Sequence, residues 1–294
     1  MQSVAYTLPV DTEFFNHAGC RLCYRIRRGS DPARALIMLH GLASNGTRWR
    51  EFAGLMAERG DWTVIAPDLR GHGHSVYRGG LSVRHWIDDL KALSAHLGLV
   101  RPVVGGHCLG ANLALTMALS EPGSVRGLVL VEPMFPGALR GALRVVRPVR
   151  WLLPILALPI RLLNALGIYR RELPLVDLTE LDQKTRKAMS EHGSHKAMLK
   201  RYAAPRKDMF YMPVATYLQA LYQVLKSPGQ IDGLAVPGLA LLSGGALLAD
   251  PGRTRSVLER IDRVKVVQLD ALHWIPTERP EDMTEAISAF LESL

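Results

Sequence analysis

The feature that most constrains the fold of this chain is the short stretch Gly-His-Cys-Leu-Gly at positions 106–110. Val-Val-Gly at 103–105 precedes it and an apolar segment at 112–119 follows, so we expect a buried strand, a sharp turn and a helix. Gly-x-Cys-x-Gly has the spacing of a nucleophile elbow, with cysteine in the place where serine is usual. Taken alone, the motif would favour a glycine-rich turn with a buried, inert cysteine. The rest of the chain favours a nucleophile at Cys108.

Short apolar runs and segments of helical apolar spacing alternate over most of the chain. The expected strands are 13–15, 21–27, 35–39, 62–66, 127–131, 236–242 and 264–269, and the expected helices are 47–59, 82–97, 253–261 and 280–294. This alternation predicts an α/β fold with a mostly parallel central sheet and helices on both faces. His40, Cys108, Glu132 and His273 each follow a strand, and the carboxyl ends of parallel strands meet at one edge.

The alternation breaks at residues 134–230, which we expect to form a helical lid (cap) inserted into a core made of 1–133 and 231–294. This insertion contains sixteen basic and six acidic residues, a difference of +10, whereas the whole chain carries +9. The core is therefore nearly neutral, and the positive field belongs to the insertion. An apolar run at 151–168 contains two prolines and Arg161, whereas a membrane span needs ~20 uninterrupted apolar residues.

The remaining cysteines and histidines do not indicate a metal or cofactor site. Three cysteines are too few for a disulfide framework. The pair Cys20 and Cys23, with His17 nearby, lacks the second pair that a tetrahedral zinc site needs, and His72 and His74 lack a third ligand. The N-terminus has no apolar secretory segment, so we expect a reducing, cytoplasmic protein, with peripheral membrane association as an option.

Four motifs, in this order, resemble those of the α/β-hydrolase superfamily. They are His-Gly-Leu at 40–42, Asp-Leu-Arg-Gly-His-Gly-His-Ser at 68–75, the elbow at 106–110 and Leu-His-Trp-Ile-Pro-Thr-Glu-Arg-Pro at 272–280. The resemblance implies the α/β-hydrolase fold and a chain order of nucleophile, acid and histidine. By position it makes Cys108 the nucleophile and His273 the general base. It also places an oxyanion hole at the backbone N–H groups of Leu42 and Leu109.

The acid of this triad is left with two possibilities. In much of the family it follows the strand that corresponds to 236–242, where the usual position aligns with Ala246, which cannot orient an imidazole. Asp250 lies four residues later. Other members take the acid from the position that Glu132 occupies here. We favour Glu132, with Asp250 as the alternative. Either would hold the tautomer of His273 and stabilise its cation.

A thiol nucleophile favours acyl chemistry. Attack of Cys108 on an ester or thioester leaves an S-acyl intermediate, which can pass its acyl group to water or to another acceptor. We therefore expect an acyl-transfer enzyme, a thioesterase or acyltransferase, that acts on an apolar acyl group. A carboxylesterase or lipase is the alternative enzyme. A non-catalytic receptor for a hydrophobic ligand, with the same fold, is the alternative of another class.

The basic insertion suggests two kinds of partner beside the acyl substrate. One is an acidic carrier protein that delivers a thioester, and the other is an anionic membrane surface. Nucleic acid is not expected, because no recognition motif is present and the insertion accounts for the charge.

Overall fold

The computed structural model describes residues 10–192, 205–245 and 247–294. Part of the predicted lid and the aligned position Ala246 therefore lie outside the described residues.

The centre of the molecule is one eight-stranded sheet with the strand order β1-β2-β4-β3-β5-β6-β7-β8. A hairpin of β1 and β2 is antiparallel, and β2 joins β4 antiparallel, whereas every later pairing is parallel. The strands are β1 Asp11–His17, β2 Cys20–Arg27, β3 Ala35–Leu39, β4 Thr63–Pro67, β5 Val103–His107, β6 Gly127–Val131, β7 Gly238–Ser243 and β8 Val264–Leu269. This confirms the predicted fold class.

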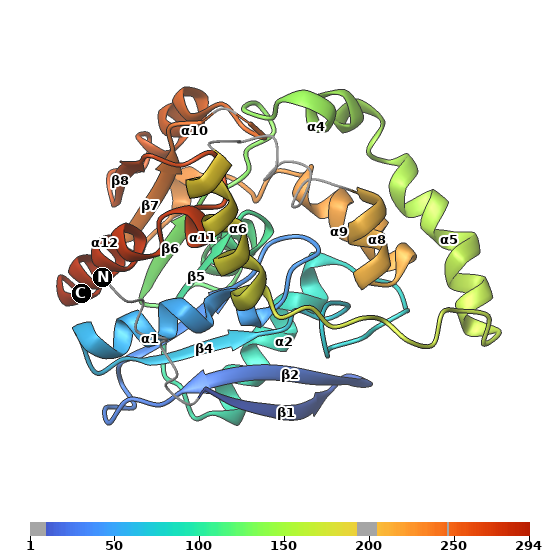
Figure 1. The fold of residues 1–294 in the computed structure, drawn as a ribbon, viewed down its shortest axis with the longest axis horizontal. Helices are drawn as coiled ribbons and strands as arrows, with labels where there is room; N and C mark the ends of the chain where they lie inside the picture. The colour runs from blue at the N-terminus through green and yellow to red at the C-terminus, as the bar shows by residue number, and fades with distance from the viewer. Residues whose placement is uncertain (1–9, 193–204, 246) are drawn as a thin grey trace.

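Helices cover both faces of the sheet (Figure 1). On one face pack α2 Val83–His96 and α3 Leu109–Ser120, and on the other α1 Arg50–Arg59 and α12 Pro280–Glu292. The central strands are buried along their whole length, as expected when helices lie on both sides. The remaining helical elements of the core are the 3-10 turns η1 Gly46–Trp49 and η3 Ile231–Gly233 and the helices α10 Pro251–Leu258 and α11 Ile275–Glu278.

Element boundaries differ from the predicted ones where proline or a cap intervenes. Strand β7 begins at Gly238 rather than Val236, because Pro237 has no N–H group for the ladder. Helix α10 begins at Pro251 rather than Arg253, because Asp250 is its N-cap and accepts a hydrogen bond from the N–H of Arg253.

The insertion is helical wherever it has regular structure in the described part. Its helices are α4 Gly141–Val146, the 3-10 turn η2 Arg147–Val149, α5 Leu152–Ala165, α6 Leu178–His192, α8 Pro205–Tyr211 and α9 Val214–Val224. Figure 1 shows α5, α8 and α9 gathered at the end of the molecule remote from α12. No helix in the described ranges has the length and apolar character needed to cross a bilayer.

Helix α6 is held to the core by ion pairs. The guanidinium of Arg48 lies 2.6 Å from a carboxylate oxygen of Asp182, and both side chains are buried. Arg186 donates to the Glu51 carboxylate at 2.8 Å and to the carbonyl oxygen of Thr277 at 3.0 Å. These contacts fix α6 beside η1, α1 and α11.

Candidate active site

The elbow has the backbone geometry that its glycines require. Cys108 lies between β5 and α3 with a φ of +54°, in the left-handed region that non-glycine residues rarely adopt. A Cβ on Gly106 would lie 2.6 Å from the carbonyl oxygen of Leu39, and one on Gly110 would lie 2.3 Å from the same atom. Neither position has room for a side chain, so β3 and the turn can approach closely only through glycine.

His273 and Glu132, which are far apart in the sequence, meet beside the elbow. Nδ1 of His273 lies 2.9 Å from a carboxylate oxygen of Glu132, and both side chains are buried. The other oxygen of Glu132 accepts a hydrogen bond from the N–H of Ser243. Glu132 is also in the left-handed region, with a φ of +51°. This leaves Nε2 of His273 for the thiol of Cys108.

The environment of His273 favours its cationic form. Burial lowers the pKa of His273, but hydrogen bonds with Cys108 and Glu132 and the negative charge on both partners outweigh burial and raise it to about 10. An imidazolium paired with a thiolate is the resting state that cysteine nucleophiles use.

Asp250, the alternative acid, is engaged elsewhere. Besides capping α10, its carboxylate lies 2.7 Å from the guanidinium of Arg140. The structure thus brings Glu132, rather than Asp250, to the ring of His273.

Glu278 is a functional residue that the sequence reasoning missed. Its carboxylate accepts hydrogen bonds from three successive N–H groups, of Leu272 at 2.9 Å, His273 at 3.1 Å and Trp274 at 2.8 Å. It therefore holds the loop that carries the imidazole. The available signal was a carboxylate five residues after His273, two residues before the helix predicted at 280–294. His107 adds a second contact, since its Nε2 lies 3.0 Å from the carbonyl oxygen of His273.

The loop at 40–42 is shaped by a buried histidine. His40 donates from Nδ1 to the carbonyl oxygen of Gly41 at 2.8 Å and accepts at Nε2 from the N–H of Leu69 at 3.0 Å. Burial lowers the pKa of His40 to about 4, so it is neutral and positions the loop. Leu42, from this loop, lies on the wall of the same cavity as Cys108, and Leu109 begins α3. The oxyanion hole at their N–H groups stays a prediction.

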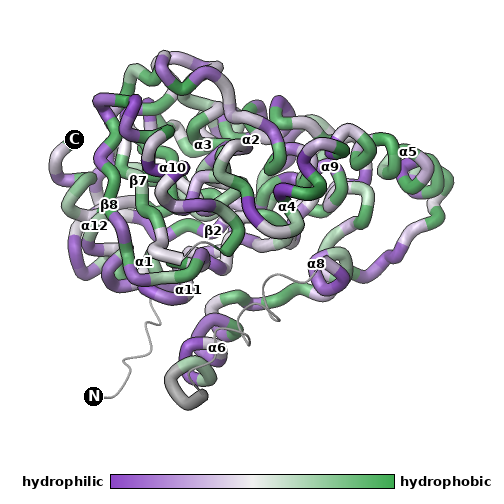
Figure 2. Tube along the Cα trace, turned by 90° about the horizontal axis from the view of Figure 1, so that it is seen from above, coloured by the Kyte–Doolittle hydropathy of each residue, from purple (hydrophilic) through white to green (hydrophobic). Residues whose placement is uncertain are grey.

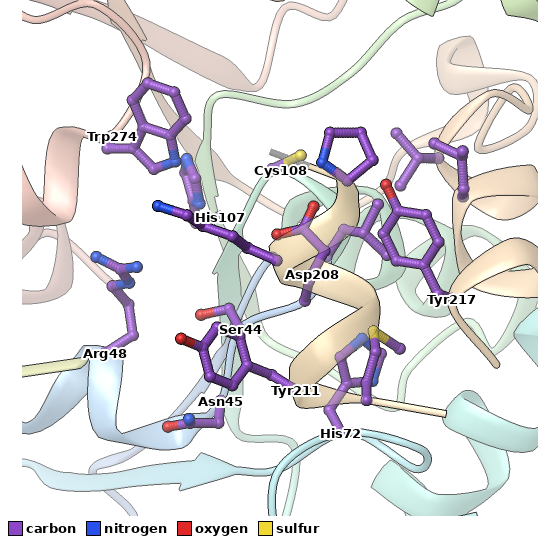
Figure 3. Close-up of a pocket in the computed structure, with 18 of the residues that line it drawn as sticks. Ser44, Asn45, Arg48, His72, His107, Cys108, Asp208, Tyr211, Tyr217 and Trp274 are labelled. Atoms are coloured by element: carbon purple, nitrogen blue, oxygen red, sulfur yellow. The ribbon is translucent and has the colours of Figure 1, made fainter. Parts of the chain in front are cut away.

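A cavity of about 370 Å³ opens above the elbow, between the core loops and the insertion (Figure 3). Core residues on its wall include Cys108, His273 and Trp274, and insertion residues on its wall are mostly apolar. The latter include Met134, Leu143, Leu175, Leu178, Leu181, Met212, Leu221 and Val224. Among the described residues, Ser44 Oγ and His72 Nε2 are buried polar atoms of this wall with no protein partner. They can bind polar groups of a ligand that is otherwise apolar.

Asp208 of α8 places one carboxyl group on the insertion side of this cavity. In the view of Figure 3 it projects between the sulfur of Cys108 and the hydroxyl of Tyr217. Burial raises the pKa of Asp208 to about 7, although a hydrogen bond from Tyr217 works in the opposite direction. The sequence did not indicate Asp208 as a site residue, because no motif or apolar spacing in it predicts that α8 lies over the elbow.

One group of possible metal ligands comes together among the described residues, and its chemistry does not fit a cation. Cys23, Asp68 and His74 offer atoms within 4.8 Å of one another. Asp68 is already bound by the guanidinium of Arg25 at 2.6 Å and by the N–H of Gly46 at 2.7 Å. Burial raises the pKa of the Cys23 thiol to about 12, which opposes the thiolate form that metals bind.

Comparison with known proteins agrees with the geometry. Residues 34–155 match the family model described as the alpha/beta hydrolase fold. An esterase from Thermogutta terrifontis superposes with a TM-score of 0.69 at 21% identity, covering 97% of this chain and 99% of that one. This chain has the α/β-hydrolase fold, and residues 34–155 match the family model of that fold.

Curated relatives within the superfamily include lipases. The sn-1-specific diacylglycerol lipase ABHD11 of Mus musculus is 26% identical over 282 residues, which is 92% of this chain and 85% of the relative. Lipase LipV of Mycobacterium tuberculosis is 35% identical over 104 residues, which is 35% of this chain and 38% of LipV. These relatives support a general hydrolase activity for this chain.

Proposed function

We propose that this protein cleaves an ester or thioester of an apolar acyl group through an S-acyl intermediate on Cys108. The observation that carries the proposal is the convergence of three buried groups below one apolar cavity. Cys108 lies in the turn with left-handed backbone. Hydrogen bonds with that thiol and with Glu132 raise the pKa of His273. The cavity is lined by the elbow on one side and by apolar helices on the other.

The reaction divides into acylation and deacylation. The Cys108 thiolate attacks the carbonyl carbon and forms a C–S bond, while the N–H groups of Leu42 and Leu109 stabilise the oxyanion. Collapse breaks the bond to the leaving alcohol or thiol, which takes the proton from Nε2 of His273. Water then gives a proton to His273 and attacks the S-acyl carbon, which releases the carboxylic acid and restores the Cys108 thiolate beside protonated His273. Glu132 holds the imidazole throughout.

Transfer to an acceptor other than water uses the same second step. A thioester is more reactive toward amines and thiols, relative to water, than an oxygen ester is. A sulfur nucleophile therefore suits transfer at least as well as hydrolysis. The apolar cavity favours an acyl chain, and Ser44 and His72 provide polar atoms for the ester group or the acceptor.

A lipase or carboxylesterase that acts only on oxygen esters is the second candidate. It is favoured by the similarity to the mouse diacylglycerol lipase, which extends over 92% of this chain.

Intact-protein mass spectrometry tests the proposal. The protein is incubated with acyl thioesters and with p-nitrophenyl esters of matched chain length. We expect a mass increase of one acyl group, absent in Cys108→Ala and retained in Cys20→Ala, whose thiol is also free and buried. Adduct decay is then followed in buffer and with added amines, thiols and alcohols.

The outcomes separate the candidates. An adduct that decays faster with one acceptor class identifies transfer, and decay in buffer alone identifies hydrolysis. An adduct from oxygen esters but never from thioesters favours the lipase or carboxylesterase. Tight binding of the acyl compound without any adduct or turnover contradicts both and identifies a receptor.

A further inference from the structure

The exposed apolar side chains of this protein are concentrated in one short stretch. Twelve of the nineteen exposed large hydrophobic residues found among the described residues lie between 145 and 169. They are Val145, Val149, Trp151, Leu152, Ile155, Leu156, Leu158, Leu162, Leu163, Leu166, Ile168 and Tyr169. Scattered single exposed hydrophobics are ordinary, but a contiguous group of this kind marks an interaction surface.

Helix α5 carries six of these twelve residues. Its inner side contacts α9 and buries Leu153 and Ala157, whereas Leu158 and Leu162 are 50% and 61% exposed. Residues 155, 158, 162 and 166 recur at helical spacing and form one continuous apolar face. In Figure 2 this helix is a predominantly apolar segment at the periphery of the molecule.

The charge of the same stretch has one sign. Residues 141–171 include six arginines, at 144, 147, 150, 161, 170 and 171, and no aspartate or glutamate. By contrast, the acidic residues of the insertion at 177 and 182 form ion pairs between the start of α6 and the core. The apolar face is therefore flanked in the sequence by charge of one sign only, which is positive.

This surface adjoins the candidate active site. Arg140, Gly141 and Leu143, at the start of α4, lie on the wall of the cavity above Cys108. On its other side, α5 packs against α9, which provides Tyr217 and Leu221 to the same wall.

We propose that the outer face of α5 and the arginines of 144–150 dock on an anionic lipid bilayer, with α5 lying in the interface. Aliphatic side chains, a flanking tryptophan and arginines without acids are the composition of helices that insert at a charged lipid surface. A second copy of the chain would bring identical arginine clusters together, which is unfavourable. Docking itself does not rest on the proposed function. Delivery of a lipid ester from the bilayer to the cavity does.

Co-sedimentation with vesicles tests the docking without any catalytic readout. The full chain is mixed with vesicles of phosphatidylcholine alone or with added phosphatidylglycerol, at low and high salt. We expect binding only to the anionic vesicles, weakened by salt, and equal binding by Cys108→Ala protein. Arg144→Gln with Arg147→Gln should weaken partitioning about 25-fold, at roughly fivefold per arginine.

The apolar contribution is tested with Leu158→Gln, Leu162→Gln and Leu166→Gln combined, since glutamine keeps helix propensity. This variant should lose binding by at least ~100-fold. Val100→Gln and Arg263→Gln remove an exposed apolar and an exposed basic side chain elsewhere and should bind as the wild type does. Thermal unfolding checks that each variant is folded.

Three results would overturn the proposal. One is equal binding to neutral and anionic vesicles, and another is anionic binding that survives the leucine variant. The third is a dimer in solution that the leucine variant converts to a monomer, which assigns the face to a second copy. If the proposed acyl chemistry fails while anionic binding holds, the docking stands and only delivery of an ester is lost.

Discussion

The two sides of the cavity above Cys108 are built in different ways. On the core side the groups with chemistry are held by several contacts each: His273 alone is bound through its ring by Glu132, through its N–H by Glu278 and through its carbonyl by His107. On the insertion side the wall is mostly apolar, and Asp208 is its half-buried carboxyl group. The core side of the cavity is therefore fixed by polar contacts, whereas the insertion side offers it mainly apolar surface.

The insertion itself contains the same contrast. Helix α6 is fixed to the core through the buried pair of Arg48 and Asp182, whereas α5 packs along α9 and leaves its outer face to solvent. Substitutions can therefore separate reaction chemistry, attachment of the insertion and surface binding.

The largest effect is expected on the core side. Glu132→Gln should lower kcat/KM about a thousandfold, because the imidazole loses the partner that fixes its tautomer and stabilises its cation. Asp250→Asn, the matched change at the alternative acid, should leave turnover within about threefold, since an asparagine still caps α10. Steady-state kinetics with one chromogenic ester measures both. Loss of turnover in Asp250→Asn alone would make our choice of acid wrong.

The attachment of α6 should show the next largest effect. Asp182→Asn leaves the guanidinium of Arg48 buried with reduced compensation, so we expect about 3 kcal/mol less stability in urea unfolding. The half-exposed pair of Arg50 and Asp177 provides the control, and Asp177→Asn should cost less than about 1 kcal/mol. Equal losses would mean that burial of the first pair is not what holds α6.

A smaller, pH-dependent effect is expected at Asp208. Its pKa in the folded protein is about 7, above the value of 3.8 that the unfolded chain shows, so folding loses free energy as pH rises from about 4 to 7. The asparagine side chain that Asp208→Asn introduces does not titrate between about pH 4 and pH 7. The variant should therefore gain stability relative to the wild type over that window, by roughly 1 kcal/mol above pH 7. Thermal unfolding from pH 4 to 8 measures the difference, and a constant difference would contradict it.

The smallest effect concerns the two faces of α5. Leu162→Gln on the outer face should change the free energy of unfolding by less than about 0.5 kcal/mol, because the side chain is already in water. Leu153→Gln on the face against α9 should cost about 2 kcal/mol. If both cost the same, the outer face of α5 is covered in solution.

Much of the core follows from the sequence because its signals are local. The runs at 127–131 and 264–269 coincide with β6 and β8. The glycines of the elbow indicate a sharp backbone turn in which no side chain fits at positions 106 and 110. The meeting of Cys108, Glu132 and His273 was also expected, since each follows a strand and strand ends share one edge. Asp250 followed by proline is a local signature too, of a helix start.

The insertion could not be predicted to the same depth, because its features depend on contacts across large sequence separations. Composition shows that 151–168 is apolar, but not that Leu153 is buried while Leu162 is exposed. The pairing of Arg48 with Asp182 joins residues 134 positions apart. Asp208 gains its raised pKa only from the surroundings that the folded α8 and α9 create.

The bend at Cys108 has a consequence for how such a protein can change its chemistry. Its left-handed backbone is permitted by the glycines on either side and by the nearness of β3, and the sulfur takes no part in holding it. A single-atom exchange of sulfur for oxygen would leave the scaffold intact and alter only reactivity. The nucleophile proposed at position 108 is thus a replaceable side chain, which selection or a designer can exchange without refolding the residues around it.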